Sequence, residues 1–191
     1  MNCEKVGVFT LSSCIIALFF SFFYDKKYLH GKYFDYKAMG WVWAWKSLSA
    51  RSIVENYKVP WPVNPKSIVT GYQNITFDID SIHIFQTPGC YWQARDGKIT
   101  IGKNCFVAPN VGIITTNHDI NDPSKHITGK DIIILDNCWI GMNAVVLPGV
   151  VLGEHTVVAA GAIVTKSFPE GHCVVAGVPA VKIKDIPKVL S

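Results

Sequence analysis

Charged residues are scarce in this chain of 191 residues. Only 17% of them are Asp, Glu, Lys or Arg and the mean hydropathy is +0.24, so the chain carries more apolar sequence than one soluble domain needs. The six cysteines include no Cys-x-x-Cys pair, and we expect them to be reduced and structural, as in a cytoplasmic domain. A net charge of +4 is too dispersed to indicate a nucleic-acid partner.

Charge is absent altogether from Val6 to Tyr24, a run of 19 residues. A helix rises about 1.5 Å per residue, so a run of this length can cross a hydrocarbon layer about 30 Å thick. No small-x-small cleavage site follows the run, which argues against a secretory signal. We therefore expect a transmembrane anchor over residues 1–24.

Basic residues are sparse before this run and dense after it. Lys5 precedes the run beside Glu4. The basic residues that follow it are Lys26, Lys27, Lys32, Lys37, Lys46 and Arg51. Because basic residues flanking a membrane span stay in the cytoplasm, we predict a single-pass protein of the cell membrane whose main domain lies on the cytoplasmic side. Anionic lipid is the simplest partner for this segment.

Residues 25–65 predict a juxtamembrane helix followed by a linker. The stretch AMGWVWAWKSL, residues 38–48, places three tryptophans beside cationic residues. This composition suits the bilayer interface and equally suits a helix packed on the main domain. The PWPVNP segment around Trp61 cannot continue a helix and is interpreted as the linker.

A branched aliphatic residue recurs at every sixth position in the second half of the chain. These residues are Ile101, Val107 and Ile113, and then Ile134, Ile140, Val146, Leu152, Val158 and Val164. Small or β-branched residues follow four positions later, at Cys105, Val111, Cys138, Ala144, Val150, Thr156 and Ala162, which predicts a sterically tight position. Glycine directly follows the aliphatic residue at positions 102, 141 and 153, where we expect sharp turns. Three strand-plus-corner units would close a triangular coil, and stacked coils would bury the aliphatic residues in one column.

This repeat resembles the hexapeptide-repeat acyltransferases. The resemblance is carried by ITIGKN, ILDNCWIGMNAVV and LGEHTVVAAGAIVTK, and it extends over about residues 98–184. It implies a mainly β fold, a left-handed parallel β-helix over residues 66–180, with residues 66–97 as degenerate first coils and residues 181–191 as a C-terminal tail. It also implies a homotrimer.

The repeat is interrupted between Ile113 and Ile134, which lie 21 positions apart, a distance that is not a multiple of six. Residues 119–131, DINDPSKHITGKD, are rich in turn residues and predict an extruded loop. His118 stands at the root of this loop. By itself it would read as a solvated loop histidine. In the sugar O-acetyltransferases of the hexapeptide family, however, a catalytic histidine occupies this place before a CWIG-like strand, here residues 138–141, so the resemblance implies that His118 is the general base.

The resemblance further implies acetyl-CoA as the acetyl donor, a hydroxyl of a sugar or polysaccharide precursor as the acceptor, and no metal. Residues assigned to acetyl-CoA are Trp139, Gly141, Met142, Ala159, Ala160, Gly161, Thr165, Lys166 and Lys182. Residues assigned to the acceptor are Gln86, Tyr91, Gln93, Asn117 and Asp119, although the last two would equally cap the turn. The backbone N–H groups near Gly141 and Met142 are the expected donors to the oxyanion.

Other functions stay open at this stage. The acceptor would equally be an amino sugar, serine or an antibiotic, because nothing in the repeat distinguishes them. A non-catalytic scaffold is suggested by Met142, Val178 and Val181, which depart from the family pattern. A β-helical carbonic anhydrase would hold metal through three histidines, and His83, His118 and His126 invite that comparison. The last two lie eight positions apart rather than close together, which argues against it.

Overall fold

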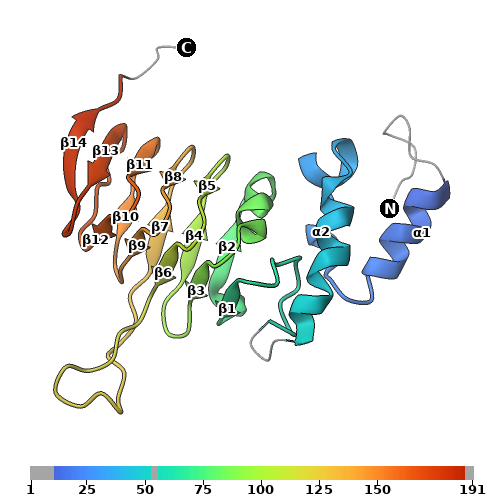
Figure 1. Ribbon diagram of the computed structural model, residues 1–191, viewed down its shortest axis with the longest axis horizontal. Helices are drawn as coiled ribbons and strands as arrows, with labels where there is room; N and C mark the ends of the chain where they lie inside the picture. Colours follow the sequence, from blue (N-terminus) through green and yellow to red (C-terminus); the bar gives the residue numbers. More distant parts are fainter. Residues whose placement is uncertain (1–10, 53–55, 188–191) are drawn as a thin grey trace.

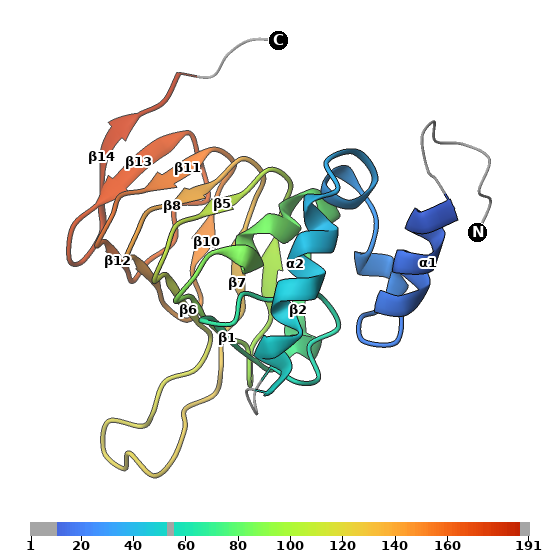
Figure 2. The same cartoon turned by 45° about the vertical axis from the view of Figure 1, so that its right-hand side comes forward.

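The computed structural model of the chain describes residues 11–52 and 56–187. It is a mainly β protein in which short strands stack into a column, with helices at the N-terminal end of the column (Figure 1). A long loop projects sideways from the middle of the column in both views (Figures 1 and 2). We call this loop, residues 115–131, the arm.

The strands of the described residues form three sheets, one for each side of the column. Sheet 1 contains β1 (Ile68–Thr70), β3 (Tyr91–Gln93), β6 (Gly112–Ile114), β9 (Val145–Val146) and β12 (Ile163–Val164). Sheet 2 contains β2 (Ile75–Phe77), β4 (Ile99–Ile101), β7 (Ile132–Ile134) and β10 (Val151–Leu152). Sheet 3 contains β5 (Phe106–Val107), β8 (Trp139–Ile140), β11 (Thr156–Val158), β13 (Cys173–Ala176) and β14 (Val181–Asp185). Every named pairing is parallel except that of β13 with β14, so the chain winds as a parallel β-helix.

The period of six is the spacing from one sheet to the next. Ile134 lies on β7, and its partner in the next coil, Leu152, lies 18 positions later on β10. Ile140 pairs with Val158 in the same way on sheet 3, and each of these side chains is at most 1% exposed. The predicted internal column is therefore confirmed. The left hand of the coil stays a prediction from the family resemblance.

The corners of the coil are not where the glycines led us to expect them. Residues with left-handed φ angles recur every six positions, two places after the position that glycine occupies at 141 and 153. They are Asn137, Asn143, Gly149, His155 and Gly161. Asparagine and glycine tolerate this conformation better than other residues. Gly141 has a different reason: an added Cβ would lie 2.6 Å from the backbone nitrogen of Ala160 in the next coil. Glycine at that position lets successive coils approach closely.

Residues 66–97 form the first turns of the coil. β1 pairs with β3, and β2 pairs with β4, both in parallel register. The third side is occupied by the 3₁₀ helix η5 (Ile79–Gln86) in place of a strand, and Ser81 Oγ donates to the carbonyl of Gly102 at 2.7 Å. The short helix η4 (Tyr72–Asn74) connects β1 to β2. A helical side explains why the repeat is degenerate in this part of the sequence.

The N-terminal helices close the open end of the column. They are α1 (Leu11–Phe20), η1 (Lys26–Tyr28), η2 (Lys32–Tyr36), α2 (Met39–Ser47) and η3 (Ser49–Ser52). The segment interpreted as a linker is part of this closure, because Trp61 is 1% exposed and its ring lies 5.1 Å from Phe77 and 5.2 Å from Phe85. Trp41 and Trp43 are half-buried on the protein whereas Trp45 is 65% exposed, so α2 divides its tryptophans between packing and solvent.

The apolar run at the N-terminus is only partly helical among the described residues. α1 ends at Phe20, and the expected continuation to Tyr24 is wrong, because Tyr24 turns inward and its hydroxyl bonds to Ser47 Oγ at 2.8 Å. Residues 1–10, which include the start of the expected anchor, lie outside the described residues. Within residues 11–52 and 56–187, no helix has the length and apolar character needed to cross a membrane.

Close stacking of the coils predicts that alanine will be tolerated at one glycine position and destabilising at another. A Cβ on Gly153 would overlap backbone atoms of Pro169 and Gly171, whereas a Cβ on Gly112 would meet nothing nearer than 3.6 Å. Gly153→Ala should therefore lower the free energy of unfolding by about 1–3 kcal/mol, because overpacking forces the coils apart. Gly112→Ala should change it little. Denaturant unfolding of both variants measures this difference, and equal midpoints would contradict the close packing described.

Candidate active site

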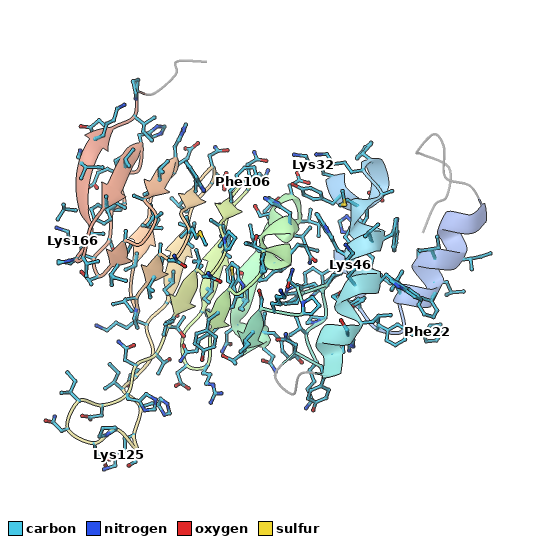
Figure 3. The ribbon with its side chains drawn as sticks, in the orientation of Figure 1. Phe22, Lys32, Lys46, Phe106, Lys125 and Lys166 are labelled. Carbon is cyan, nitrogen blue, oxygen red and sulfur yellow. The ribbon has the colours of Figure 1, made fainter. Side chains whose placement is uncertain are left out.

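The arm leaves the column from β6 and returns to it at β7. Its two sides are held together by the backbone, through Lys130 N to Thr115 O at 2.9 Å, Ile127 N to Asn117 O at 3.0 Å and Asp119 N to Lys125 O at 2.9 Å. The pairing makes the arm a two-stranded ribbon, at the tip of which Figure 3 labels Lys125. His118 and His126 face each other across this ribbon as an isolated antiparallel pair.

The ring of His118 is held in one orientation. Its Nδ1 lies 2.7 Å from the carbonyl oxygen of Pro123, and because a carbonyl oxygen only accepts, Nδ1 carries the proton and donates it. In the neutral ring this leaves the Nε2 lone pair without a proton. The side chain is exposed, and the ring of His126 packs against it with the centroids 4.3 Å apart. His118 therefore presents a basic nitrogen from an oriented ring, which is what general-base catalysis needs.

Gln93 holds the root of the arm. Its Oε1 accepts from the backbone N–H of Thr115 at 3.0 Å and of Thr116 at 3.1 Å, and its Nε2 donates to the carbonyl of Thr116 at 3.1 Å. The side chain is 6% exposed. The buried amide of Gln93 thus hydrogen-bonds to the backbone where the chain leaves sheet 1, two residues before His118. Gln93 was expected to contact the acceptor, but its polar atoms are directed at the protein.

The other residues assigned to the acceptor divide into two groups. Asp119 caps the turn, with Oδ1 accepting from Asn121 N at 2.7 Å, and Gln86 donates to Pro62 O at 2.7 Å beneath the helical end. Asn117 is exposed beside His118, and Tyr91 is 38% exposed on the outer face of sheet 1. Asn117 and Tyr91 are consequently the two of these residues that are exposed, whereas Gln86 and Asp119 are half-buried.

Five of the nine residues assigned to acetyl-CoA lie along one edge of the column. Gly141 and Met142 follow β8, and Ala159, Ala160 and Gly161 follow β11 one coil later, so the five lie where sheet 3 meets sheet 1. We call this set the small-residue edge. A Cβ built on Gly161 would meet no atom within 4 Å, which leaves open space over this edge. Trp139, just before it, is 54% exposed.

One expected oxyanion donor is already engaged. The N–H of Gly141 donates to the carbonyl of Val158 at 2.8 Å as part of the ladder between coils, so it is not available to a ligand. The carbonyl of Met142 accepts from Gly161 N at 2.8 Å. Among the described residues the N–H of Met142 has no acceptor, and it is the remaining candidate of the two.

The repeat that builds the column matches a known protein family. Residues 131–166 match the family described as bacterial transferase hexapeptide (six repeats). The matched residues run from the return of the arm through β12, so this part of the column is similar to the hexapeptide-repeat transferases. A protein of Schizosaccharomyces pombe named as an acetyltransferase is 44% identical over 91 residues, which are 46% of this chain and 44% of that protein. Galactoside O-acetyltransferase of Escherichia coli K12 is 39% identical over 94 residues, 48% of this chain and 46% of that protein.

Among solved structures, the crystal structure of a maltose O-acetyltransferase from Clostridium difficile 630 is similar to this chain. It has 37% sequence identity and a TM-score of 0.48, and the match covers 52% of this chain and 54% of that one. The chain spans about half the length of the curated relatives that it matches.

The three residues assigned to the nucleotide end of acetyl-CoA are exposed on the column: Thr165, Lys166 and Lys182. Thr165 and Lys166 follow β12, and Lys166 Nζ lies 5.8 Å from the ring centroid of Phe168. Lys182 forms an ion pair with Asp185 at 2.6 Å, and this contact raises the pKa of the lysine. Of these two lysines, Lys182 is paired with a carboxylate, whereas Lys166 forms no ion pair with a described residue.

The three histidines of the carbonic anhydrase comparison do not gather. His83 lies on η5, packed between the rings of Tyr33 at 5.1 Å and Phe106 at 4.9 Å, and burial lowers its pKa. His118 and His126 lie on the arm. Across residues 11–52 and 56–187, no three His, Cys, Asp or Glu side chains are grouped to hold a metal ion.

The structure separates the base from the small-residue edge. His118 follows β6 of sheet 1 and precedes β7 of sheet 2, so it stands where these two sheets meet. The small-residue edge stands where sheet 3 meets sheet 1. Within one chain the two therefore lie on different edges of a triangular column.

Two contacts that hold the ring of His118 could not be predicted from the repeat, namely those with the carbonyl of Pro123 and the ring of His126. Pro123 was recognised only as a turn residue, and His126 was considered only as a metal ligand. A histidine eight positions after His118 becomes its neighbour only because the arm folds back as a ribbon, with its bend between them. Backbone carbonyls such as that of Pro123 are invisible in a sequence pattern.

The role of Gln93 can be tested apart from any reaction. Gln93→Leu would leave the N–H and the carbonyl of Thr116 without their partner, and each buried group left unpaired costs about 1–3 kcal/mol. We expect the free energy of unfolding to fall by about 2–4 kcal/mol, with faster amide exchange at Thr115 and Thr116. Gln73→Leu, at an exposed glutamine on η4, is the control. Unchanged stability and exchange in Gln93→Leu would remove the proposed support.

Proposed function

We propose that this protein is an acetyltransferase that moves an acetyl group from acetyl-CoA to a hydroxyl of a sugar or of a polysaccharide precursor. The observation that supports it most directly is His118, an exposed residue on a hexapeptide-repeat scaffold whose Nδ1–H is committed to Pro123 O, which leaves Nε2 as the basic nitrogen. Imidazole titrates near neutral pH and suits the removal of a proton from a hydroxyl that is attacking a carbonyl.

The reaction would proceed as follows. His118 Nε2 takes the proton of the acceptor hydroxyl while its oxygen bonds to the thioester carbonyl carbon of acetyl-CoA. The N–H of Met142 would stabilise the negative charge that develops on the carbonyl oxygen. As the carbon–sulfur bond breaks, the imidazolium of His118 returns its proton to the departing thiolate, so the base is regenerated and the products are an acetyl ester and CoA. The carbonyl of Pro123 keeps the ring oriented in both protonation states.

The choice of acceptor rests on the relatives and on the N-terminal segment. Galactoside O-acetyltransferase is named for a sugar acceptor, and the family match over residues 131–166 begins where the arm returns to the column. A polysaccharide precursor would bring the acceptor to a membrane. We propose accordingly that the catalytic domain works at the cytoplasmic side of the cell membrane, as the basic residues after the apolar run indicate.

We also propose that the active unit is a homotrimer. His118 and the small-residue edge lie on different edges of one column, which supports a site completed by a second chain. Three columns packed side by side would place the arm of one chain against the small-residue edge of its neighbour. The exposed rings of Phe106 and Trp139, which are paired neighbours on sheet 3, lie on the face that adjoins that edge.

The base assignment is tested by His118→Ala. Acetyl transfer to a galactoside should lose about a hundredfold or more in kcat, the usual contribution of a general base, while the affinity for CoA stays nearly unchanged. His30→Ala, at an exposed histidine near the helical end, is the control and should keep full activity. A variant with normal kcat at position 118 would end the proposal that this histidine is the base.

The donor site is tested at Ala160 rather than at Gly161. Gly161 has a φ of 72°, where any side chain is strained, whereas Ala160 is exposed and free of that constraint. Ala160→Trp should weaken CoA binding about tenfold or more, equivalent to about 1.4 kcal/mol or more, by filling the space over the small-residue edge. Thr100→Trp, on the outer face of sheet 2, is the control in the same calorimetric titration. Equal affinities for CoA would place the donor elsewhere.

A further inference from the structure

The helical end of the molecule carries an exposed apolar surface. On α1 and the turn after it, Ile15, Leu18 and Phe22 are 62%, 60% and 80% exposed, and on α2 Trp45 is 65% exposed. The rings of Phe19 and Trp45 lie 6.4 Å apart, so the exposed side chains of the two helices are continuous. We call these five residues the α1–α2 surface. α1 is the outermost element of the described chain, beyond α2 and away from the column (Figures 1 and 2).

This surface is distinct from the side of the helices that packs on the protein. Phe20 is 3% exposed and Tyr24 is 4% exposed, and Phe20 stacks on Trp41 with the ring centroids 6.1 Å apart. α1 is therefore apolar on two sides, and the described chain covers only one of them. A short helix that is apolar on its solvent side needs another apolar environment to cover that side.

The net charge of the protein arises beside this surface. From Asp25 to Arg51 the sequence has six basic and two acidic residues, which is a surplus equal to the whole net charge of +4. Residues 1–24 have one of each sign, and residues 52–191 have eleven of each. Phe22 and Lys46 are labelled at the helical end in Figure 3, far from Lys166 on the column. Counted by segment, the positive charge is therefore less dispersed than the whole sequence suggested: the catalytic domain is electrically balanced, and the surplus lies in the segment that follows α1.

We infer that the α1–α2 surface docks onto an anionic phospholipid bilayer. Its aromatic and aliphatic side chains would enter the boundary between headgroups and acyl chains, and Lys26, Lys27 and Lys46 would lie among the headgroups. A second copy of the chain is a poorer occupant, because it would bring two segments of charge +4 together. This inference rests on the membrane location proposed above. It adds which surface of the protein would contact the membrane and which class of lipid that surface would bind.

The experiment is sedimentation of the full chain with vesicles of phosphatidylcholine, with and without phosphatidylglycerol. The wild-type chain should bind the anionic vesicles more tightly, and added salt should weaken the binding. Replacing Leu18 and Phe22 by serine should weaken it about tenfold or more, because apolar area entering the bilayer is lost. Lys26→Glu combined with Lys46→Glu should weaken it by at least a similar factor, since each basic residue near the surface contributes about fivefold.

Two matched controls use exposed residues of the column, Ile183→Ser and Lys103→Glu, which should bind like the wild type. Binding equal on neutral vesicles, or unchanged by the α1 and lysine substitutions, would overturn the assignment. So would a wild-type dimer that Phe22→Ser dissociates, because the surface would then be a protein interface. Acetyl transfer to a soluble galactoside, measured in the same variants, should stay at the wild-type level. Vesicle binding without any transferase activity would contradict the proposed reaction and leave the docking surface in place.

Discussion

The spacing between successive coils is the constraint on which the rest of the molecule depends. Along the regular part of the column, a backbone N–H donates to the carbonyl 17 positions later, as from Leu135 to Leu152 at 2.9 Å, Gly141 to Val158 at 2.8 Å and Val145 to Ala162 at 2.9 Å. Buried backbone groups must be paired, so this ladder permits little variation. It accounts for the aliphatic column inside and for the glycines where coils approach. It also gives a rigid exterior on which an oriented histidine can be carried.

The sequence predicted those parts of the structure that repeat. The column residues, the tight inward positions and the break after Ile113 follow from a period that can be counted, whereas His118 was singled out by the family resemblance. Supports that act through single contacts could not be predicted in this way. Gln93 was recognised as polar but not as the partner of Thr116, because that contact joins residues 23 positions apart at a place where the period has stopped. The engagement of Gly141 N–H by Val158 likewise follows from register, which the period alone does not supply.

For the N-terminal segment, the sequence predicted an apolar environment but not which residues are buried in the protein. Its composition indicated an apolar environment, but composition does not say which side of each helix meets protein. Trp61 proved to be a core residue against the first coil and Phe20 a buried residue between the helices, whereas Phe22 and Trp45 remain outside. The same few helices thus complete the column and present a second apolar face. A local sequence pattern cannot separate these two uses because both select aromatic residues with basic neighbours.

The left-handed corners limit how the chain length of this protein can vary. Asn137, Asn143, Gly149, His155 and Gly161 occupy one conformation at one interval, so a single inserted residue in the coil would put an unsuited side chain into every later corner and shift each aliphatic residue off the axis. Whole coils can be added or lost, and so can segments that exit and re-enter at one edge, as the arm does. The arm can therefore change in length through evolution or engineering, while the column beneath it changes only by whole coils of 18 residues.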